Sequence, residues 1–477
     1  MPARIVALPT TAAPTTLQEA LAALRARLEI PAQLPASVTA AAEQAASRVH
    51  RPALDRTDLE LVTIDPPGSR DLDQALHIAR TSQGYEVSYA IAAVASFVAA
   101  GDPIDVEARR RGLTFYAPDL RTPLHPPVLS EGAASLLADQ DRPALLWTLQ
   151  LDHDGELRDA RVVRALVRSR EQLTYEQAQR EVDSGTPRST LALLVEVGQL
   201  REERERDRGG VSLQIPTQEI SVDDRGRYTL SYRANLPIER FNAQISLLTG
   251  IAAARYMLAG RIGILRTLPP AEPGALQRLR RTAAALQIRW DDQQPYPEFV
   301  RSLDPTVAPH AAMLNACTEL FRGAGYVAFD GTLPAQTGHA ALATDYAHAT
   351  APLRRLIDRF VGEICLALAA GEPVPDWTRA ALPELPELMS AAESRAKRYE
   401  RAVVDLVEVS LLRGRLGEQF TGTVVDVESK GKRGIVLLTD PAVQGRVTGP
   451  DLPLGAEVDL RLTSADWETG RAEFTRV

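Results

Sequence analysis

The chain has 477 residues, of which 45% are hydrophobic and 24% are charged, and its formal net charge is −8. This length is too great for one ordinary core, so we expect two or three domains with the composition of a soluble globular protein. The negative charge excludes a protein that coats nucleic acid with its outer surface, but it is compatible with a locally basic channel that encloses a strand.

Two Ala-rich helices are predicted at the N-terminus. Apolar residues recur at helical spacing over residues 16–28, Pro31 ends this helix, and a second helix is expected over residues 37–48. Residues 1–16 lack the basic start and apolar block of a secretion signal, so the cytoplasm is the expected location. Two interpretations of this unit stay open. It is either a nucleic-acid-binding helix-turn-helix or a packing or dimerising element, because no basic cluster marks a recognition helix.

An acidic motif follows the helices. Residues 59–64 predict a short buried strand, and the Pro-Pro-Gly sequence at 66–68 must turn the chain, so Asp65 stands at the strand's end. Asp71 and Asp73 point the same way if the backbone there is extended, and they can then converge with Asp65. Carboxylates this close repel one another unless a cation neutralises them, and their hard oxygen atoms suit Mg²⁺ or Mn²⁺. A solvated acidic turn is the alternative interpretation.

The motif resembles the signature of a known enzyme family. Residues 63–65 (T-I-D) and 71–75 (D-L-D-Q-A) are similar to the pattern of the ribonuclease II (RNB) family of exoribonucleases, in which T-I-D is followed at fixed spacing by D-x-D-D-A. Gln74 departs from this pattern, because the family usually has a fourth aspartate there. The Gln74 amide oxygen can still face a metal, but the neutral side chain removes one formal charge, so metal affinity is expected to fall.

The long middle part of the chain alternates strand-like and helix-like segments without an internal repeat. Residues 57–413 therefore predict one large α+β domain. The longest apolar run, residues 89–101, is too short to cross a bilayer, so we expect no membrane contact. Cys317 and Cys365 lie in apolar helical surroundings, which indicates buried thiols and not a disulfide framework or a zinc site.

The resemblance continues through this domain in the family's order. Residues 104–116 (I-D-V-E-A-R-R-R-G-L-T-F-Y) resemble its D-x-E-A-x-x-R-x-x-S-x-Y segment, and residues 173–176 (L-T-Y-E) fit the next. Residues 346–355 (Y-A-H-A-T-A-P-L-R-R) resemble Y-A-H-x-T-(S/A)-P-(I/L)-R-R. Residues 398–403 (R-Y-E-R-A-V) are similar to the closing R-x-E-R-x-V helix. The resemblance therefore covers most of the chain.

The segment before Arg354 is predicted to start a helix, because Thr350 and Pro352 suit a helix N-terminus. A helix start presents free N–H groups and a positive dipole end, so Arg354 would add to an anion site. The alternative is that Arg354 and the charged residues after it form ion pairs along a solvated helix face. The resemblance implies that Arg354 binds phosphate.

Five short strands are predicted after residue 418, and this pattern fits a small OB-fold barrel. The resemblance implies that the barrel binds RNA, and Lys430 and Lys432 give one of its turns a modest basic patch for backbone contacts. The predicted fold class is therefore α+β multidomain. Its parts are an N-terminal helical unit (1–52), an RNB-type catalytic domain (53–413) and a C-terminal OB-fold β-barrel (414–477).

The resemblance implies a metal-dependent, hydrolytic 3′-to-5′ exoribonuclease that degrades single-stranded RNA to 5′-mononucleotides in RNA turnover, and that also acts on structured RNA with a 3′ overhang. The RNA 3′ end is the expected partner, Mg²⁺ or Mn²⁺ the expected cofactor, and a monomer the expected state. Carboxylate-held divalent ions activate water and neutralise developing charge, while a preorganised arginine stabilises the transition-state phosphate. The expected catalytic residues are Asp73 and Arg354, and the expected metal ligands are Asp65, Asp71 and Asp73.

Seven residues are expected to bind RNA. Tyr116 matches the family position at which the last 3′ base stacks, and such stacking tolerates any base. The alternative interpretation of Tyr116 is a core tyrosine. The alternative interpretation of His348 and Glu400 is that each is a buried polar group that packs between helices. The expected RNA-binding residues are Tyr116, Tyr175, His348, Arg354, Glu400, Lys430 and Lys432.

Two functions from other classes stay open. Gln74 favours a catalytically impaired RNB-fold protein that binds RNA without cutting it. The N-terminal helices are compatible with a DNA-binding regulator. On that view, deleting residues 1–50 should abolish DNA binding and leave nuclease chemistry on short unpaired RNA largely intact.

Overall fold

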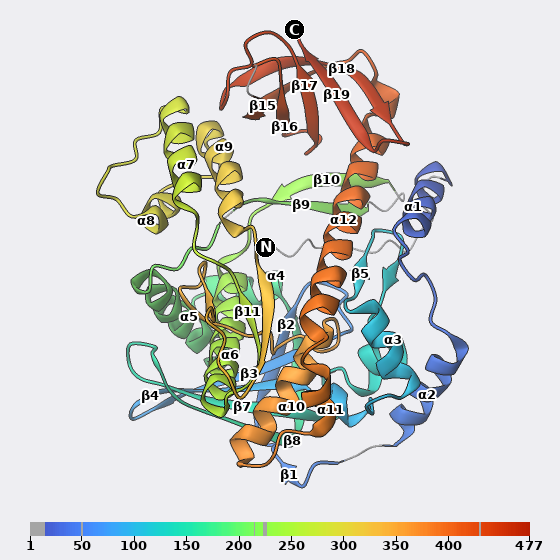
Figure 1. Ribbon diagram of the computed structural model, residues 1–477, viewed down its shortest axis with the longest axis vertical. Coiled ribbons are helices and arrows are strands. Elements are labelled where there is room, and N and C mark those ends of the chain that lie inside the picture. Colours follow the sequence, from blue (N-terminus) through green and yellow to red (C-terminus); the bar gives the residue numbers. More distant parts are fainter. Residues whose placement is uncertain (1–14, 49–50, 214, 223–226, 429–430) are drawn as a thin grey trace.

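The fold has three kinds of structure: N-terminal helices, a large mixed α+β region and a C-terminal barrel (Figure 1). The sequence predicted this fold class, and the structure confirms it. The domain boundaries at residues 52 and 413 stay predictions. The computed structural model describes residues 15–48, 51–213, 215–222, 227–428 and 431–477.

A six-stranded sheet lies at the centre of the α+β region, in the order β1-β8-β2-β3-β4-β7. Most neighbours are antiparallel, but β8 runs parallel to β2 and β1. At 18 residues β8 is long enough to pair with β7 through its first part and with β2 through its end, which brings Thr174 beside Asp65. The strands are β1 (Leu54–Asp55), β2 (Leu61–Asp65), β3 (Gln74–Thr81), β4 (Gly84–Ala92), β7 (Asp141–Leu151) and β8 (Leu157–Thr174).

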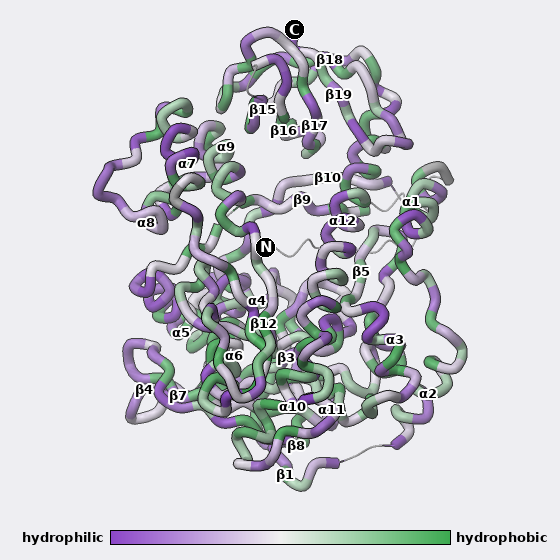
Figure 2. The backbone as a smooth tube through the Cα atoms, in the orientation of Figure 1, coloured by the Kyte–Doolittle hydropathy of each residue, from purple (hydrophilic) through white to green (hydrophobic). Residues whose placement is uncertain are grey.

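Helices pack against this sheet and bury its apolar side chains. Trp147 of the sheet and Phe360 of α10 are fully buried in this core, and Figure 2 shows hydrophobic residues gathered where α6 and α10 meet the sheet. The helices of the region are α3 (Pro103–Arg111), α4 (Tyr175–Asp183), α5 (Ser189–Asp207), α6 (Pro237–Gly260), α10 (Leu356–Ala370), α11 (Asp376–Ala381) and α12 (Leu385–Leu412).

The two N-terminal helices, α1 (Thr15–Arg27) and α2 (Ala36–Ser47), form where the apolar spacing predicted them. They bury their apolar faces in two different cores. Leu21 of α1 packs in a cluster with residues of α12, whereas Val38 of α2 packs in a cluster with residues of the central sheet. Both helices are therefore attached to the rest of the chain and not mainly to each other.

The C-terminal part is a closed five-stranded barrel in the order β15-β16-β17-β19-β18. It follows α12, which runs from the central region to the barrel (Figure 1). The alternating burial along each strand places one face in the barrel core, as the sequence pattern predicted. The barrel strands are β15 (Gln419–Val427), β16 (Arg433–Leu438), β17 (Gln444–Thr448), β18 (Glu457–Asp466) and β19 (Arg471–Arg476).

A small helical layer joins the central region to the barrel. Residues of α7, α8 and α9 share a hydrophobic cluster with Val425 of β15, so this layer supports one side of the barrel. Cys317, at the end of α9, and Cys365 are free and buried, which confirms the prediction. The helices of this layer are α7 (Pro273–Ala285), α8 (Tyr296–Arg301) and α9 (Ala308–Cys317). Two separate strand pairs complete the region: β9 (Thr217–Val222) with β10 (Tyr228–Arg233), and β11 (Ile262–Thr267) with β12 (Gly325–Asp330).

Within the described part of the chain, no helix has the length and apolar character that crossing a membrane requires.

A buried ion pair ties α3 to α10, and its removal should destabilise the fold. Asp105 pairs with Arg359 and also accepts a hydrogen bond from the Gly101 N–H at 2.8 Å; both charged side chains are nearly inaccessible. Asp105→Ala would leave Arg359 buried without its counter-charge, so we expect the free energy of unfolding, measured in urea, to fall by about 3 to 5 kcal/mol. Asp159→Ala, at an exposed pair, is the control and should change it by less than about 1 kcal/mol.

The contribution of Asp105 should also depend on pH. Burial opposes ionisation, but Arg359 and the Gly101 N–H more than offset it and hold the pKa of Asp105 below its ordinary value. A carboxyl whose pKa is lowered in the folded state contributes stability above its unfolded pKa, about 3.9, and loses it as pH falls through the folded pKa. The difference between the wild-type protein and Asp105→Ala should therefore shrink only below about pH 4, and a difference that already shrinks near neutrality would contradict this assignment.

Candidate active site

The acidic motif occupies the end of β2 and the approach to β3. The chain turns after Asp65 at a Pro-Pro-Gly sequence, where the Ser69 N–H donates to the Pro66 carbonyl at 3.2 Å and Gly68 has a φ of +77° that favours glycine. The backbone then runs without a helix to β3, with Leu72 fully buried in the core. The residues on either side of Leu72, Asp71 and Asp73, instead contact arginines.

Asp73 is the most enclosed of the three aspartates, with only 4% of its surface exposed. Its Oδ1 accepts a hydrogen bond from the Leu353 N–H at 2.7 Å, and its Oδ2 lies 3.2 Å from Arg354 Nε. Burial, aided by the negative charge of Asp71, raises the pKa of Asp73 well above its ordinary value, although Arg354 and the Leu353 N–H act in the opposite direction. The Asp73 carboxylate is therefore held in place, but the positive charge of Arg354 does not fully offset the effect of burial on it.

Asp65 and Asp71 complete the acidic group. The Oδ2 atom of Asp65 is buried and has no hydrogen-bond partner among the described residues. Burial raises the pKa of Asp65 to about 7, the charge of Asp71 adds to this, and Arg354 opposes it. Asp71 is paired with Arg121, whose Nη1 lies 2.7 Å from Asp71 Oδ1. The charge of Asp71 thus helps to raise the pKa of both other aspartates.

The residues present fit a divalent cation, although the aspartates do not stand as a finished ligand set. Among the residues that the structure describes, no three His, Cys, Asp or Glu side chains are grouped closely enough to hold a metal ion. The predicted convergence is therefore looser than expected, because Arg121 and Arg354 occupy oxygen atoms of Asp71 and Asp73. The unpartnered Asp65 Oδ2 and the hard oxygen donors are nevertheless those that Mg²⁺ or Mn²⁺ prefers.

Arg354 lies in a turn and not at a helix start. The prediction of a helix beginning at Thr350 is wrong, because α10 begins only at Leu356. The preceding residues pair with another segment instead: Thr114 N–H donates to the Arg354 carbonyl at 3.0 Å, and Leu356 N–H donates to the Gly112 carbonyl at 3.0 Å. The side chain of Arg354 is 47% exposed while its Nε faces Asp73, so it can still reach a phosphate from solvent.

Gln74 belongs to a series of hydrogen bonds. Its Nε2 donates to the Thr350 carbonyl at 2.5 Å, and its Oε1 accepts from the Tyr89 hydroxyl at 2.9 Å. The Tyr89 hydroxyl in turn lies 2.8 Å from Ser246 Oγ. Tyr89 therefore uses one of the two lone pairs of the Gln74 amide oxygen, and a metal contact of this oxygen stays a prediction.

Two of the predicted RNA-binding tyrosines lie beside the aspartates. Tyr116 is half-buried, and burial together with the negative charge of Asp71 raises the pKa of its hydroxyl. Tyr175 begins α4 directly after Thr174, which pairs with Asp65 across β8 and β2. Burial, with the charge of Asp65, raises the pKa of Tyr175 to about 12. Both hydroxyls are therefore neutral donors near the acidic group.

Besides Arg354, three of the other predicted RNA-binding residues lie on other segments of the described chain: His348, Glu400 and Lys432. The Nδ1 of His348 lies 2.8 Å from the hydroxyl of Tyr326, which also donates to Glu393 at 2.6 Å, and burial lowers the pKa of His348 well below its ordinary value. Glu400 is half-buried on α12. Lys432 is exposed in the turn between β15 and β16, whereas Lys430 lies outside the described residues. Their roles stay predictions.

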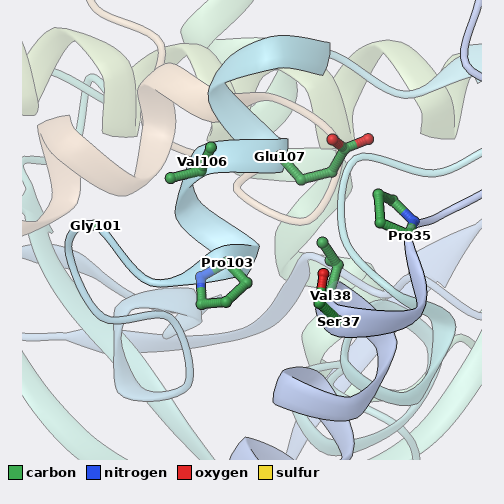
Figure 3. A pocket seen from close by; sticks show the side chains of 7 residues that line it. All are labelled: Pro35, Ser37, Val38, Gly101, Pro103, Val106 and Glu107. Atoms are coloured by element: carbon green, nitrogen blue, oxygen red, sulfur yellow. The ribbon is translucent and has the colours of Figure 1, made fainter.

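A pocket of about 360 Å³ lies between the starts of α2 and α3 (Figure 3). No candidate site residue lines it. Its one ionisable lining residue, Glu107, accepts hydrogen bonds from Arg110 at 2.8 Å and Arg111 at 2.7 Å, which leaves the pocket without free catalytic groups. The lining residues are Pro35, Ser37, Val38, Gly101, Pro103, Val106 and Glu107.

Comparison with protein families now identifies the central region. The model of the RNB domain matches residues 54–369, which is most of the chain and contains all three aspartates and Arg354. The chain belongs to the RNB family. The model of the RNase II-type exonuclease C-terminal S1 domain matches residues 418–477, which form the barrel of this RNB protein.

Individual RNB proteins resemble the chain over most of its length. Ribonuclease R of Aquifex aeolicus is 27% identical over 454 residues, which cover 86% of this chain and 63% of that protein. The chain spans 34% to 63% of the length of the first curated relatives that it matches. Among solved structures, the apo form of Mycoplasma genitalium RNase R matches with a TM-score of 0.86 and 19% identity, covering 97% of this chain and 78% of that one. Yeast Ssd1, a pseudonuclease, matches with a TM-score of 0.68 and 18% identity, covering 92% and 53%.

Sequence reasoning missed one charged residue of this RNB site. Arg121 pairs with Asp71 and also contacts Glu131, so it neutralises part of the acidic group. Arg121 lies on a two-residue strand, β6 (Arg121–Thr122), which pairs with β5 (Phe115–Tyr116). Such short strands leave no periodic pattern in the sequence, and no local signal indicated that this arginine would face the aspartates.

Proposed function

We propose that this RNB chain is a divalent-metal-dependent exoribonuclease that removes 5′-mononucleotides from the 3′ end of single-stranded RNA. The observation that carries the proposal is the pair of enclosed aspartates with raised pKa values, Asp65 and Asp73, beside the half-exposed Arg354. Strong pKa perturbation next to a specific charge partner is typical of catalytic sites, where a cation or substrate completes the electrostatics.

Each residue has a distinct task in this proposal. Asp65, Asp71 and Asp73 would hold Mg²⁺ or Mn²⁺, which when bound supplies an activated water and neutralises charge at the leaving oxygen. Arg354 offers its guanidinium to the phosphate, where preorganised positive charge favours the transition state over the ground state. Tyr116 offers an aromatic face to the last base, which supports binding without selecting a sequence.

The relatives support RNA as the substrate class. Several of them are named ribonuclease R or exosome complex exonuclease, and Mycoplasma genitalium RNase R has been solved in complex with single-stranded RNA and with double-stranded RNA. We extend this to the chain as a proposal. A single-stranded 3′ end is the expected substrate, and a duplex with a 3′ overhang is a second one.

The decisive experiment follows products from both ends of the RNA. We expect a 5′-labelled single-stranded RNA to shorten progressively, and a 3′-labelled one to release labelled mononucleotide at once, in Mg²⁺ or Mn²⁺. Excess EDTA should stop the reaction, and added metal should restore it, because the paired aspartates need a cation to act. Fragments longer than a mononucleotide in the first turnover would indicate an endonuclease and contradict the proposal.

A second candidate function is RNA binding without cleavage. The observation that favours it is Gln74, whose amide is engaged by Tyr89 and Thr350 and supplies no fourth carboxylate. The fold of yeast Ssd1, a pseudonuclease, is also compatible with it. In the same experiment this function predicts stable binding of the RNA and no mononucleotide with either ion. Release with one ion is enough to reject it.

A further inference from the structure

The hairpin of β5 and β6 carries two side chains of the candidate site. Tyr116 and Arg121 are directly opposite each other in it, and Arg121 reaches Asp71. The hairpin pairs only two residues on each side, and so small an antiparallel pair is not stable by itself. Its position must therefore be fixed by what packs around it.

Helix α1 holds the tip of this hairpin. Arg25 donates from both Nη atoms to the two carboxylate oxygens of Asp119, each at 2.8 Å, and Asp119 lies in the turn between β5 and β6. The two side chains are only 11% and 13% exposed, so water screens the pair weakly. A bidentate pair of this kind fixes orientation as well as distance. Arg25 also lies 3.5 Å from the Tyr399 hydroxyl of α12.

Apolar contacts join the same elements. Leu17, Leu21 and Leu24 of α1 are fully or almost fully buried in one cluster with Phe115 of β5 and Tyr399 of α12. The rings of Phe115 and Tyr399 meet edge to face, with centroids 6.3 Å apart. Helix α1 therefore shares a hydrophobic core with Phe115, the residue that precedes Tyr116, and Figure 1 shows α1 lying beside α12 and β5.

A second tie fixes the base of the hairpin. Arg111, which is 1% exposed, donates to the Gln33 carbonyl at 2.8 Å and to the Pro123 carbonyl at 2.9 Å. Gln33 belongs to the link between α1 and α2, and Pro123 follows β6. The N-terminal segment thus contacts the tip of the hairpin directly through Arg25 and is connected to its base through Arg111.

We propose that Arg25 is a positioning residue for the RNA 3′ end. Through Asp119 it holds the β5–β6 hairpin so that Tyr116 can receive the terminal base and Arg121 can hold Asp71. The inference rests on the proposed function for the nature of the ligand. It also revises the expectation that deleting residues 1–50 leaves the chemistry intact, since the deletion would remove the support of the hairpin.

The test reads base stacking directly and without hydrolysis. An RNA with 2-aminopurine as its 3′-terminal base is mixed with the Asp73→Asn variant, which should bind the RNA without cleaving it. Stacking of this base on Tyr116 should quench the 2-aminopurine fluorescence. Combining this variant with Arg25→Gln, which removes the charge and both Nη donors but keeps a polar side chain, should abolish most of that quenching. Reversing the pair, with Arg25→Asp and Asp119→Arg together, should restore it. Arg27→Ala, on the exposed face of the same helix, is the matched control and should change nothing.

Hydrolysis provides the second readout in the chain with Asp73 intact. We expect Arg25→Gln to lower kcat/KM by roughly tenfold or more, because small misplacements of a reacting end are costly, and the reversed pair to recover most of it. Unchanged quenching in Arg25→Gln, with or without a lower melting temperature, would overturn the proposal. A loss of quenching or of kcat/KM that the reversed pair does not restore would also overturn it. If the wild-type protein fails to cleave RNA, the proposed function fails while the quenching experiment still tests Arg25.

Discussion

Asp73→Asn should reduce RNA hydrolysis by at least about 100- to 1,000-fold while RNA binding changes little. The substitution is nearly isosteric, so one side-chain oxygen can still accept the Leu353 N–H, but the negative charge that faces Arg354 and any bound cation is lost. The measurement is the single-turnover rate of mononucleotide release at saturating enzyme and Mg²⁺, combined with a binding titration in EDTA.

The control for Asp73→Asn is Asp154→Asn, at an exposed position on the turn before β8. That variant should behave as the wild-type protein in both measurements. Substantial residual cleavage by Asp73→Asn would show that the aspartate has been given the wrong role. A loss of binding equal to the loss of rate would instead make Asp73 a structural residue.

Arg354→Ala should also lower the rate of cleavage by about 100- to 1,000-fold, because it removes the preorganised positive charge at the phosphate. It should leave a buried Asp73 without its ion pair and raise the pKa of that carboxyl further, since Arg354 is the main group that opposes the effect of burial. Arg354→Lys keeps the positive charge but lacks the planar guanidinium, so its cleavage rate should lie between those of the wild-type protein and Arg354→Ala.

The measurement for Arg354 is the same single-turnover rate, taken over a series of Mg²⁺ concentrations. An effect that vanishes at high Mg²⁺ would assign Arg354 to metal affinity and contradict its role at the phosphate. Arg161→Ala is a suitable control, because the Arg161 side chain is 79% exposed on β8 and pairs with another exposed residue, Asp159. It should keep the wild-type rate.

Much of the fold could be predicted from local patterns. The helical spacing of apolar residues predicted α1, α2 and α12 to within a few residues, and short strand-like segments after residue 418 predicted the barrel strands. These elements depend on burial of one face, which the order of residues records directly. The double pairing of β8 could not be predicted, because it depends on which distant strands lie on either side of it.

The site was predicted where chemistry is concentrated in the sequence and missed where it depends on tertiary contacts. The order of Asp65, Asp71 and Asp73 predicted that they converge, but no three acidic side chains of the described residues lie close enough to hold a metal ion. Two of these aspartates pair instead with Arg121 and Arg354. The helix start at Thr350 was wrong because Arg354 and Leu356 pair with the segment after α3, a long-range contact that overrides local preference. Arg121 was missed for the same reason, because only folding brings it to Asp71.

The hydrogen-bond series through Gln74 limits which side chain position 74 can accept. An aspartate at position 74 has no side-chain N–H to donate to the Thr350 carbonyl, and its shorter side chain would not reach the Tyr89 hydroxyl. Gln74→Asp would therefore leave the Thr350 carbonyl and the Tyr89 hydroxyl without the hydrogen bonds that Gln74 makes with them. A carboxylate at this position would fit only if Tyr89, Ser246 or the loop that carries Arg354 changed as well.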